Sequence, residues 1–329
     1  MKRRQFIKLV GSAATSWPLV ARAQHQAMAV IGYVDGSRVA LTGTQQLLAA
    51  IRKTLAANGF VEGKNFRFEF REAEGQFNRL PGLYRELVDQ KVTVIVAPST
   101  AQLEAARSAT QTIPIIFLTG LDPVGKGFVA SINRPGGNLT GVFNLASLTT
   151  GKRVEVLQEL VPSLRKIAFL TNRQDVDLSQ AEAKAAQEAA SLFHLDLLVV
   201  SASNADELEA AFETSIREGV GAMVVGSNAR FYVLVRPLAA LATRYRLPVI
   251  HIWQGAAREG VLVSYGADQD ESWELVGYFV ARVIKGEKVA DIPVQQLSKT
   301  KMVINLNTAK TFGITVPASL LGRADEVIE

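Results

Sequence analysis

The chain has 329 residues, with 36 lysine and arginine residues, 31 aspartate and glutamate residues and no cysteine. The lack of thiols excludes disulfides, thiol catalysis and thiolate metal sites. It also removes the cysteine to which a lipoprotein anchor is attached, so we expect no lipid anchor. A chain of this length predicts two domains.

The first 23 residues have the pattern of an export signal. A basic head over residues 2–8 contains the pair Arg3 and Arg4, and a mildly apolar stretch follows over residues 9–20. Residues 21–23 (Ala-Arg-Ala) then match the small-x-small pattern that a signal peptidase cleaves. The run Arg-Arg-Gln-Phe-Ile-Lys resembles a twin-arginine signal. We therefore expect residues 1–23 to be a signal peptide and the mature protein to be periplasmic and soluble; the alternative is a basic, poorly ordered N-terminus on a cytoplasmic protein.

The formal net charge of +5 comes from this N-terminal segment. The segment holds five basic residues and no acidic residue, so the rest of the chain has 31 basic and 31 acidic residues. A neutral mature chain has no general electrostatic attraction for nucleic acid or for an anionic membrane. We therefore expect neither as a partner.

From residue 29 onward, short apolar runs alternate with amphipathic segments. This alternation predicts parallel strands covered by helices on both faces of a sheet. In the first half, the predicted strands are 29–34, 66–70, 92–97 and 114–118, and the predicted helices are 44–58, 80–90 and 101–109. A cluster of Asn, Pro and Gly at residues 133–138 predicts a loop that ends this half.

The same alternation restarts after the loop. The predicted helices of the second half are 152–160, 178–193, 205–218, 232–245, 271–285 and 308–312. The predicted strands are 166–171, 195–201, 222–226, 248–252, 261–265 and 302–306. We therefore expect two doubly wound α/β lobes with parallel sheets. No repeat with a period of 20–50 residues is present, which excludes a solenoid.

The residues directly after each strand are the candidates for a binding site, because ligands of open α/β sheets bind beyond the carboxyl ends of the strands. These residues are rich in hydroxyl and amide groups and include two aromatic rings, which suits a small polar solute with an apolar part. The candidate ligand-binding residues are Asp35, Ser37, Ser99, Thr100, Thr119, Asp122, Asn172, Asn228, Trp253 and Tyr265.

Several of these candidates have a purely structural alternative. Ser99 or Thr100 would cap the helix that follows, although the N-terminus of that helix would also bind a carboxylate. Asp122 would start a turn, because Pro123 follows it. Trp253 would be a residue of the cleft rim or of a hinge.

The sequence shows no catalytic or metal-binding pattern. The three histidines, His25, His194 and His251, lack metal-ligand spacing, and His251 lies in an apolar strand where we expect it to be packed. A P-loop, a dinucleotide fingerprint and a nucleophile elbow are all absent. Residues 120–127 superficially resemble a phosphate loop but lack its residue order. We therefore expect no enzyme activity, no cofactor and no metal.

Long ordered runs carry a family resemblance over essentially the whole mature chain. They are residues 117–142, 152–162, 263–268, 284–296 and 303–329. These runs resemble ABC transporter substrate-binding proteins of the TrpX-like branch of the type I periplasmic binding proteins.

This resemblance implies the type I periplasmic-binding-protein fold, an α/β fold of two doubly wound parallel-sheet lobes joined by a three-strand hinge. Lobe 1 would comprise residues 28–143 and 261–290, and lobe 2 would comprise residues 144–260 and 291–329. The three crossovers would lie near residues 142–147, 253–260 and 291–298. A ligand would bind in the cleft between the lobes, and hinge closure would produce the form that a membrane permease recognises.

The family is associated with aromatic amino acids and related small solutes. By this resemblance, Ser99 and Thr100 with the adjacent N–H groups would hold a carboxylate, and Asp122 would bind an amino group. Trp253 and Tyr265 would form aromatic walls.

Arg230 adds a basic side chain near the expected cleft mouth. It would favour a ligand with a second carboxylate, or an aromatic acid that lacks an amino group.

The leading functional hypothesis is a monomeric solute-binding component of an ABC importer, with a permease in the inner membrane as its partner. A sensory binding protein that docks on a membrane receptor would have the same sequence features. An α/β isomerase or transferase is a third hypothesis. It would need a catalytic base in the cleft, for which Asp35 and Asp122 are the candidates.

Overall fold

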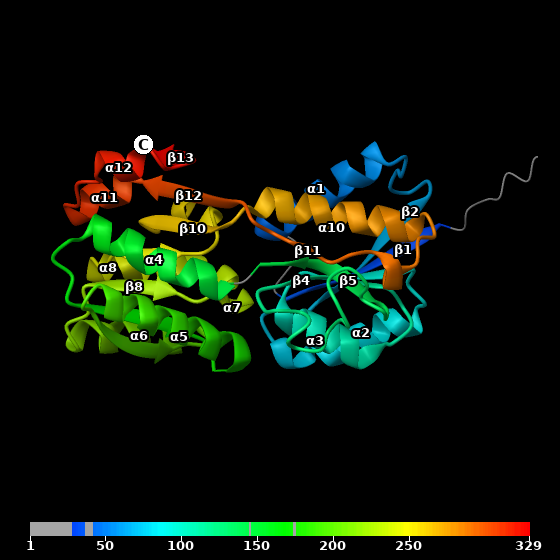
Figure 1. Ribbon diagram of the computed structural model, residues 1–329, viewed down its shortest axis with the longest axis horizontal. Helices are drawn as coiled ribbons and strands as arrows, with labels where there is room; N and C mark the ends of the chain where they lie inside the picture. The colour runs from blue at the N-terminus through cyan, green and yellow to red at the C-terminus, as the bar shows by residue number, and fades with distance from the viewer. Residues whose placement is uncertain (1–27, 37–41, 145, 174–175) are drawn as a thin grey trace, which may run out of the picture.

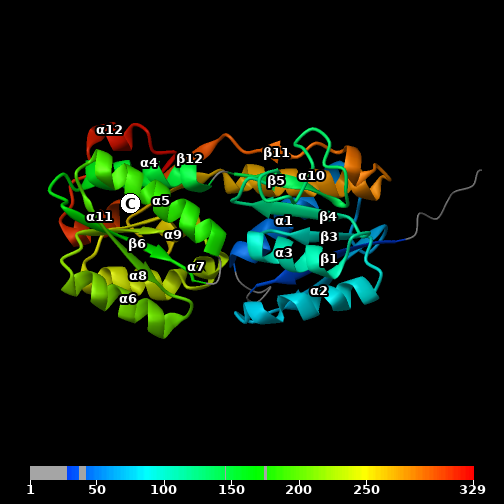
Figure 2. The ribbon, with the colours of Figure 1, turned by 60° about the horizontal axis from the view of Figure 1, so that its bottom comes forward.

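The computed structural model describes residues 28–36, 42–144, 146–173 and 176–329. It has two α/β lobes that lie one beyond the other along the longest axis of the molecule (Figure 1). Figure 2 shows that each lobe is a layered unit with helices on both sides of a sheet. The predicted signal peptide, residues 1–23, lies outside the described residues. Within the described ranges, no helix has both the length and the apolar composition needed to cross a membrane.

The sheet of lobe 1 has six strands in the order β11-β5-β4-β3-β1-β2, and every pair is parallel. The strands are β1 (Ala29–Asp35), β2 (Phe66–Glu72), β3 (Val94–Ala97), β4 (Ile115–Thr119), β5 (Leu139–Phe143) and β11 (Gln295–Gln296). The central strand β3 is buried along its whole length, as its continuous apolar sequence predicts.

Two pairs of helices cover the opposite faces of this sheet (Figure 1). They are α1 (Thr42–Ala57) with α10 (Gln269–Ile284), and α2 (Leu80–Asp89) with α3 (Thr100–Ala109); the short helices η1 (Phe77–Arg79) and η2 (Val289–Asp291) complete the lobe. On α1, Leu48, Ile51 and Leu55 recur at helical spacing and pack in the same core as Val276 and Val280 of α10. Burial of this apolar stripe fixes α1 and α10 on the sheet.

The sheet of lobe 2 has seven strands in the order β13-β12-β10-β9-β8-β6-β7. The strands are β6 (Lys166–Thr171), β7 (Asp196–Ser201), β8 (Ala222–Val225), β9 (Val249–His251), β10 (Val263–Ala267), β12 (Thr300–Asn305) and β13 (Glu326–Ile328). All pairs are parallel except β10 with β12.

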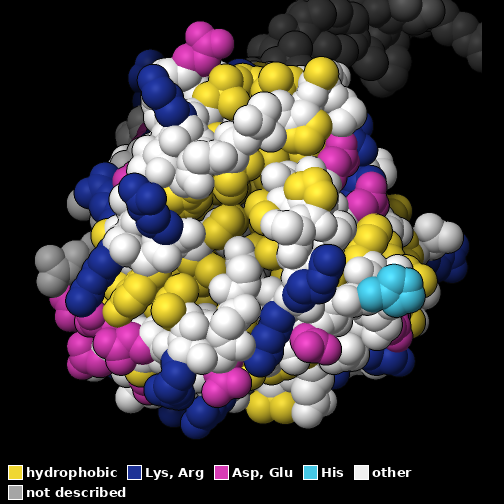
Figure 3. Space-filling view, turned by 90° about the vertical axis from the view of Figure 1, so that its left-hand side faces the viewer, with side chains coloured by type: hydrophobic (Ala, Val, Ile, Leu, Met, Phe, Trp, Pro, Cys, Tyr) yellow, Lys and Arg dark blue, Asp and Glu magenta, His cyan; other side chains and the backbone are white. Residues whose placement is uncertain are grey.

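Alternate residues of these strands face two separate cores. One core packs against α4 (Ala146–Leu160) and α5 (Val176–Leu192), and the other against α6 (Ala205–Arg217) and α8 (Val235–Tyr245). Shorter helices are α7 (Ala229–Val233), α9 (Gly255–Arg258), α11 (Leu306–Phe312) and α12 (Ala318–Leu321). Figure 3 views lobe 2 from its outer end and shows apolar side chains gathered in the middle of that face, with basic and acidic side chains around them.

The chain passes between the lobes after β5, after β10 and after β11. The prediction that residues 261–290 all belong to lobe 1 is wrong for β10, because β10 pairs with β9 and β12 of lobe 2. The second crossover is therefore at residues 267–269, and the predicted crossover at 253–260 lies inside lobe 2, where it contains α9. The third crossover follows β11, because β11 pairs with β5 and so remains in lobe 1. The prediction that residues 291–329 all belong to lobe 2 is therefore wrong for β11.

Candidate functional site

A cavity of about 270 Å³ lies between the two lobes. Lobe 1 supplies the carboxyl ends of β1, β3 and β4 and the first turns of α1 and α3, and lobe 2 supplies the segments that follow β8 and β9. The cavity therefore lies at the strand ends where parallel α/β sheets bind ligands. Its volume is just below the usual range of small-molecule sites, which begins at about 300 Å³.

The cavity brings together most of the candidates predicted from the sequence. The lining includes Asp35, Ser99, Thr100, Thr119, Asn228 and Trp253. Ser37 lies outside the described residues. Asn228 also caps α7, because its Oδ1 accepts a hydrogen bond from the N–H of Arg230 at 2.9 Å.

Asp122, Asn172 and Tyr265 do not line the cavity, so the prediction of ligand contact is corrected for these three residues. Asp122 is exposed and starts a turn, since its Oδ1 accepts a hydrogen bond from the N–H of Val124 at 3.0 Å. Asn172 is fully buried and its Nδ2 donates to a backbone carbonyl at the end of β7 at 2.9 Å. The hydroxyl of Tyr265 lies 3.2 Å from the Oγ1 of Thr300 on the neighbouring strand β12.

The N-terminus of α3 opens onto the cavity. Ser99 caps it, because its Oγ accepts from the N–H of Gln102 at 3.3 Å and donates to the Gln102 Oε1 at 2.6 Å. The Gln102 Nε2 donates in turn to the carbonyl of Val34, which ties the start of α3 to β1. The first N–H groups of a helix point out of its N-terminal end. Those of Thr100 and Ala101 are therefore placed to bind an anion in the cavity.

Asp35 puts a buried carboxylate in the wall of lobe 1, with 2% of its surface exposed. Its Oδ2 accepts a hydrogen bond from the Thr44 Oγ1 at 2.5 Å. Burial, together with the negative charge of Asp35, raises the pKa of Tyr33. The other charged residues of the described lining, Arg236 and Glu259, form an ion pair with each other at 2.9 Å.

A buried network supports the wall of lobe 2. The Glu182 Oε1 accepts hydrogen bonds from the Arg153 Nη2 at 2.9 Å, the Thr150 Oγ1 at 3.0 Å and the Ser227 Oγ at 2.6 Å. The Glu182 Oε2 accepts from the N–H of Ser227 at 2.8 Å. Burial lowers the pKa of Arg153, while the Glu182 carboxylate opposes that shift. The network therefore fixes Ser227, a lining residue, in a single orientation.

Aromatic side chains form another part of the wall. The rings of Trp253 and Tyr232 lie with their centroids 5.3 Å apart, and Phe77 and Trp273 contribute from lobe 1. Behind Trp253, the Nδ1 of His251 accepts a hydrogen bond from the Trp253 N–H at 3.0 Å. Burial lowers the pKa of His251 to about 3, with the positive charge of Arg153 acting in the same direction, so His251 is a neutral, packed residue.

Arg230 bridges the two lobes and is not part of the described cavity lining. Its Nη1 donates to the carbonyls of Gly75 in lobe 1 and Ser203 in lobe 2, both at 3.1 Å. Its guanidinium lies 4.5 Å from the centroid of the Phe77 ring. In this structure the Arg230 side chain therefore links the two lobes, and its contact with a ligand carboxylate stays a prediction.

The list of candidates missed several lining residues. Thr44 lies in the first turn of α1, the helix that follows β1, and could have been found by extending the search beyond each strand end into the next helix. Ser227 lies two residues beyond the end of β8, in the loop before α7, and fits the rule of strand ends itself. Tyr232 and Trp273 carry no sequence signal, because the relative position of the lobes brings them to the cavity.

Residues 37–328 match the model of a family described as ABC transporter substrate binding protein. The chain belongs to this family. The prediction of family is thereby confirmed, and so is the prediction that the protein is a binding protein and not an enzyme.

Individual relatives agree with this assignment. The substrate-binding protein is 27% identical over 258 residues to the tyrosine-binding protein of Clostridioides difficile (strain R20291), covering 78% of this chain and 74% of that relative. It superposes with a TM-score of 0.82 and 25% identity on an ABC domain from Streptococcus pneumoniae in complex with L-Trp, over 92% of this chain and 100% of the other. A ligand-free, open substrate-binding protein with adhesive properties from Clostridium difficile superposes with a TM-score of 0.64 and 23% identity, over 92% and 99%. The predicted fold of two parallel-sheet α/β lobes is confirmed.

Proposed function

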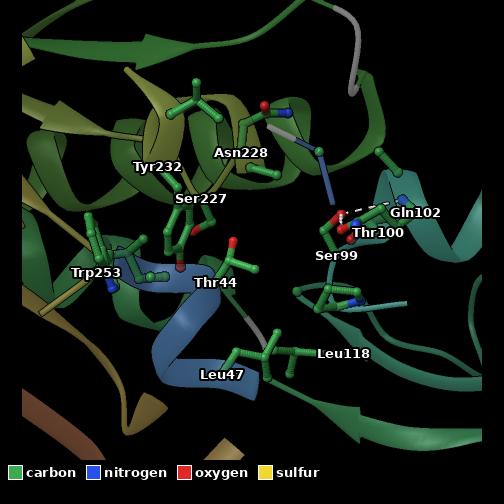
Figure 4. Close-up of a pocket in the computed structure, with 18 of the residues that line it drawn as sticks. Thr44, Leu47, Ser99, Thr100, Gln102, Leu118, Ser227, Asn228, Tyr232 and Trp253 are labelled. Carbon is green, nitrogen blue, oxygen red and sulfur yellow. Dashed lines mark hydrogen bonds between the residues drawn. The ribbon is translucent and has the colours of Figure 1, made fainter. Parts of the chain in front are cut away.

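We propose that the substrate-binding protein captures a small amino acid or aromatic carboxylate outside the cytoplasm and delivers it to the permease of an ABC importer. The observation that carries the proposal is the arrangement of the cavity. Ser99 and Thr100 at the start of α3 lie on one side of it, and Tyr232 and Trp253 lie on the other (Figure 4). A carboxylate at the helix N-terminus would leave the apolar part of the ligand against the aromatic rings. The ligands named for two relatives, tyrosine and L-Trp, have this form.

Contacts between the lobes support capture by hinge closure. The Lys126 Nζ of lobe 1 lies 2.5 Å from the Asp177 Oδ2 of lobe 2. Leu121 of lobe 1 packs with Ala146 and Leu178 of lobe 2. These groups would separate when the cleft opens, so they would contribute to the stability of the closed form only.

Ligand screening of the mature protein, residues 24–329, tests this proposal. We expect aromatic amino acids or aromatic carboxylates to raise the melting temperature, because a ligand that binds only the folded state stabilises it. Titration calorimetry should give one site per chain, and the ligand should be recovered chemically unchanged. Consumption of the ligand, or stabilisation by none of these solutes, would contradict the proposal.

We also propose that residues 1–23 direct export by the twin-arginine route. Replacing Arg3 and Arg4 together by lysine should retain the full-length precursor in the cytoplasm, whereas the wild-type protein should reach the periplasm without its first 23 residues. Fractionation and intact mass measure both outcomes. Normal export of the double variant would exclude the twin-arginine route while leaving the ligand-binding proposal unaffected.

A further inference from the structure

Ser227 presents an acceptor, and not a donor, to the cavity. Its hydroxyl proton is donated to the Glu182 Oε1 at 2.6 Å and its N–H to the Glu182 Oε2 at 2.8 Å. An ionised carboxylate can only accept hydrogen bonds. Glu182 is 1% exposed and forms an ion pair with Arg153 at 2.9 Å, which holds the carboxylate in place. The Ser227 Oγ therefore directs only lone pairs towards a ligand.

Thr44 has the same property in the opposite lobe. Its Oγ1 donates to the Asp35 Oδ2, a second buried carboxylate that can only accept. Thr44 and Ser227 both line the cavity, and Figure 4 shows them entering it from α1 and from the β8–α7 segment respectively. Two hydroxyl oxygens, each with a carboxylate behind it, thus face the same cavity from different lobes.

This arrangement selects for a donor with positive charge. Each hydroxyl oxygen is polarised by the carboxylate to which it donates, which strengthens it as an acceptor. A ligand carboxylate has no proton to donate, so neither hydroxyl oxygen could accept a hydrogen bond from it. The ligand carboxylate would instead favour the N-terminus of α3.

We infer that Thr44 and Ser227 together bind the protonated amino group of the ligand, and that Glu182 is a positioning residue that sets the direction of the Ser227 hydroxyl. This inference rests on the proposed function and makes it more specific: the ligand is an α-amino acid, and an acid without an amino group is a weaker ligand. The amino group also connects the two lobes, because its two hydroxyl partners belong to different lobes.

Two probes that differ only in the amino group test the inference: L-tryptophan and 3-(indol-3-yl)propanoate, titrated into the mature protein. Ser227→Ala and Thr44→Val each remove one acceptor and leave the buried ion pair intact. Each should weaken L-tryptophan binding about tenfold, as expected for a hydrogen bond to a charged group, and should change binding of the propanoate less than twofold. Thr44→Ser keeps the hydroxyl and should retain the wild-type ratio of the affinities for L-tryptophan and for the propanoate. Ser203→Ala is the matched control, because Ser203 is outside the described lining.

Glu182→Leu tests the positioning role. It removes the acceptor of the Ser227 hydroxyl, so the hydroxyl could turn its proton towards the cavity, and the preference for L-tryptophan over the propanoate should fall about tenfold. If this variant does not fold, because Arg153 loses its partner, the Ser227 and Thr44 variants decide the question.

If Ser227→Ala and Thr44→Val reduced the affinity for both probes equally, the amino-group subsite would be disproved, whereas the proposed function would stand. Failure of the wild-type protein to bind either probe, or any aromatic amino acid, would overturn both.

Discussion

Replacing His251 by asparagine should remove a large part of the acid sensitivity of the fold. Burial holds the pKa of His251 at about 3, compared with its ordinary value of 6.5 in the unfolded chain. Between these two pH values the unfolded chain binds a proton that the folded protein does not bind. Stability is therefore fully present above pH 6.5 and is lost as the pH falls towards 3. The loss is about 1.4 kcal/mol per pH unit, or roughly 3 kcal/mol between pH 6.5 and 4.5.

Urea unfolding followed by tryptophan fluorescence from pH 7.5 to 4.5 measures this effect. Asparagine retains an acceptor for the Trp253 N–H, which the His251 Nδ1 accepts at 3.0 Å, but it does not titrate. The variant should therefore lose roughly 3 kcal/mol less than the wild-type protein over the same pH range. His194→Asn is the matched control, because His194 is exposed and asparagine tolerates its positive φ of 57°. Parallel pH profiles for the wild type and His251→Asn would refute the reasoning.

Three further predictions concern the aromatic wall, the contact between the lobes and the packing of the sheets. Trp253→Leu should weaken binding of aromatic ligands roughly tenfold, whereas Tyr265→Leu should leave the affinity unchanged, because only Trp253 lines the cavity. Arg230→Ala should weaken all ligands by a similar factor of about five in calorimetry, since the side chain joins the lobes; a loss confined to dicarboxylates would contradict this role. Gly266→Ala should destabilise the protein by about 2–3 kcal/mol in urea unfolding, because a Cβ there would lie 2.4 Å from the carbonyl oxygen of Ile252, directly after the neighbouring strand β9. Gly82→Ala, on a helix with open space around it, should be neutral or stabilising by up to about 1 kcal/mol, and similar behaviour of the two glycine variants would be inconsistent with this packing.

The sequence predicted the elements whose local pattern is strong. Examples are the apolar runs that form β3 and β8 and the apolar stripe on α1. Each can be recognised locally, because burial of a strand or of a helix face requires that pattern. Strand β5 (Leu139–Phe143) was missed, since glycine and threonine interrupt its apolar run directly after a loop-forming cluster. The lobe to which β10 belongs depends on pairing with β9 and β12, and nothing within residues 263–267 encodes that choice.

The sequence likewise predicted only some of the residues of the candidate site. The rule that ligands bind at strand ends found Asp35, Ser99 and Trp253, because these positions follow from the strand order alone. The hydroxyl of Ser227 acquires its direction from Glu182, which is 45 residues away along the chain. Such a contact depends on the packing of α5 against the sheet, so a single sequence could not reveal it.

The three crossings of the chain between the lobes also determine when the protein can fold during its synthesis. Lobe 1 begins at the N-terminus, yet it needs α10 and β11 from near the C-terminus to cover one face and one edge of its sheet. Lobe 2 likewise needs β12 and β13. Neither lobe can therefore complete its core while the ribosome is still translating the middle of the chain, and independent expression of one lobe from a continuous stretch of sequence would leave apolar helix and sheet surfaces uncovered. Folding of this protein is coupled to completion of the chain rather than to the emergence of successive domains.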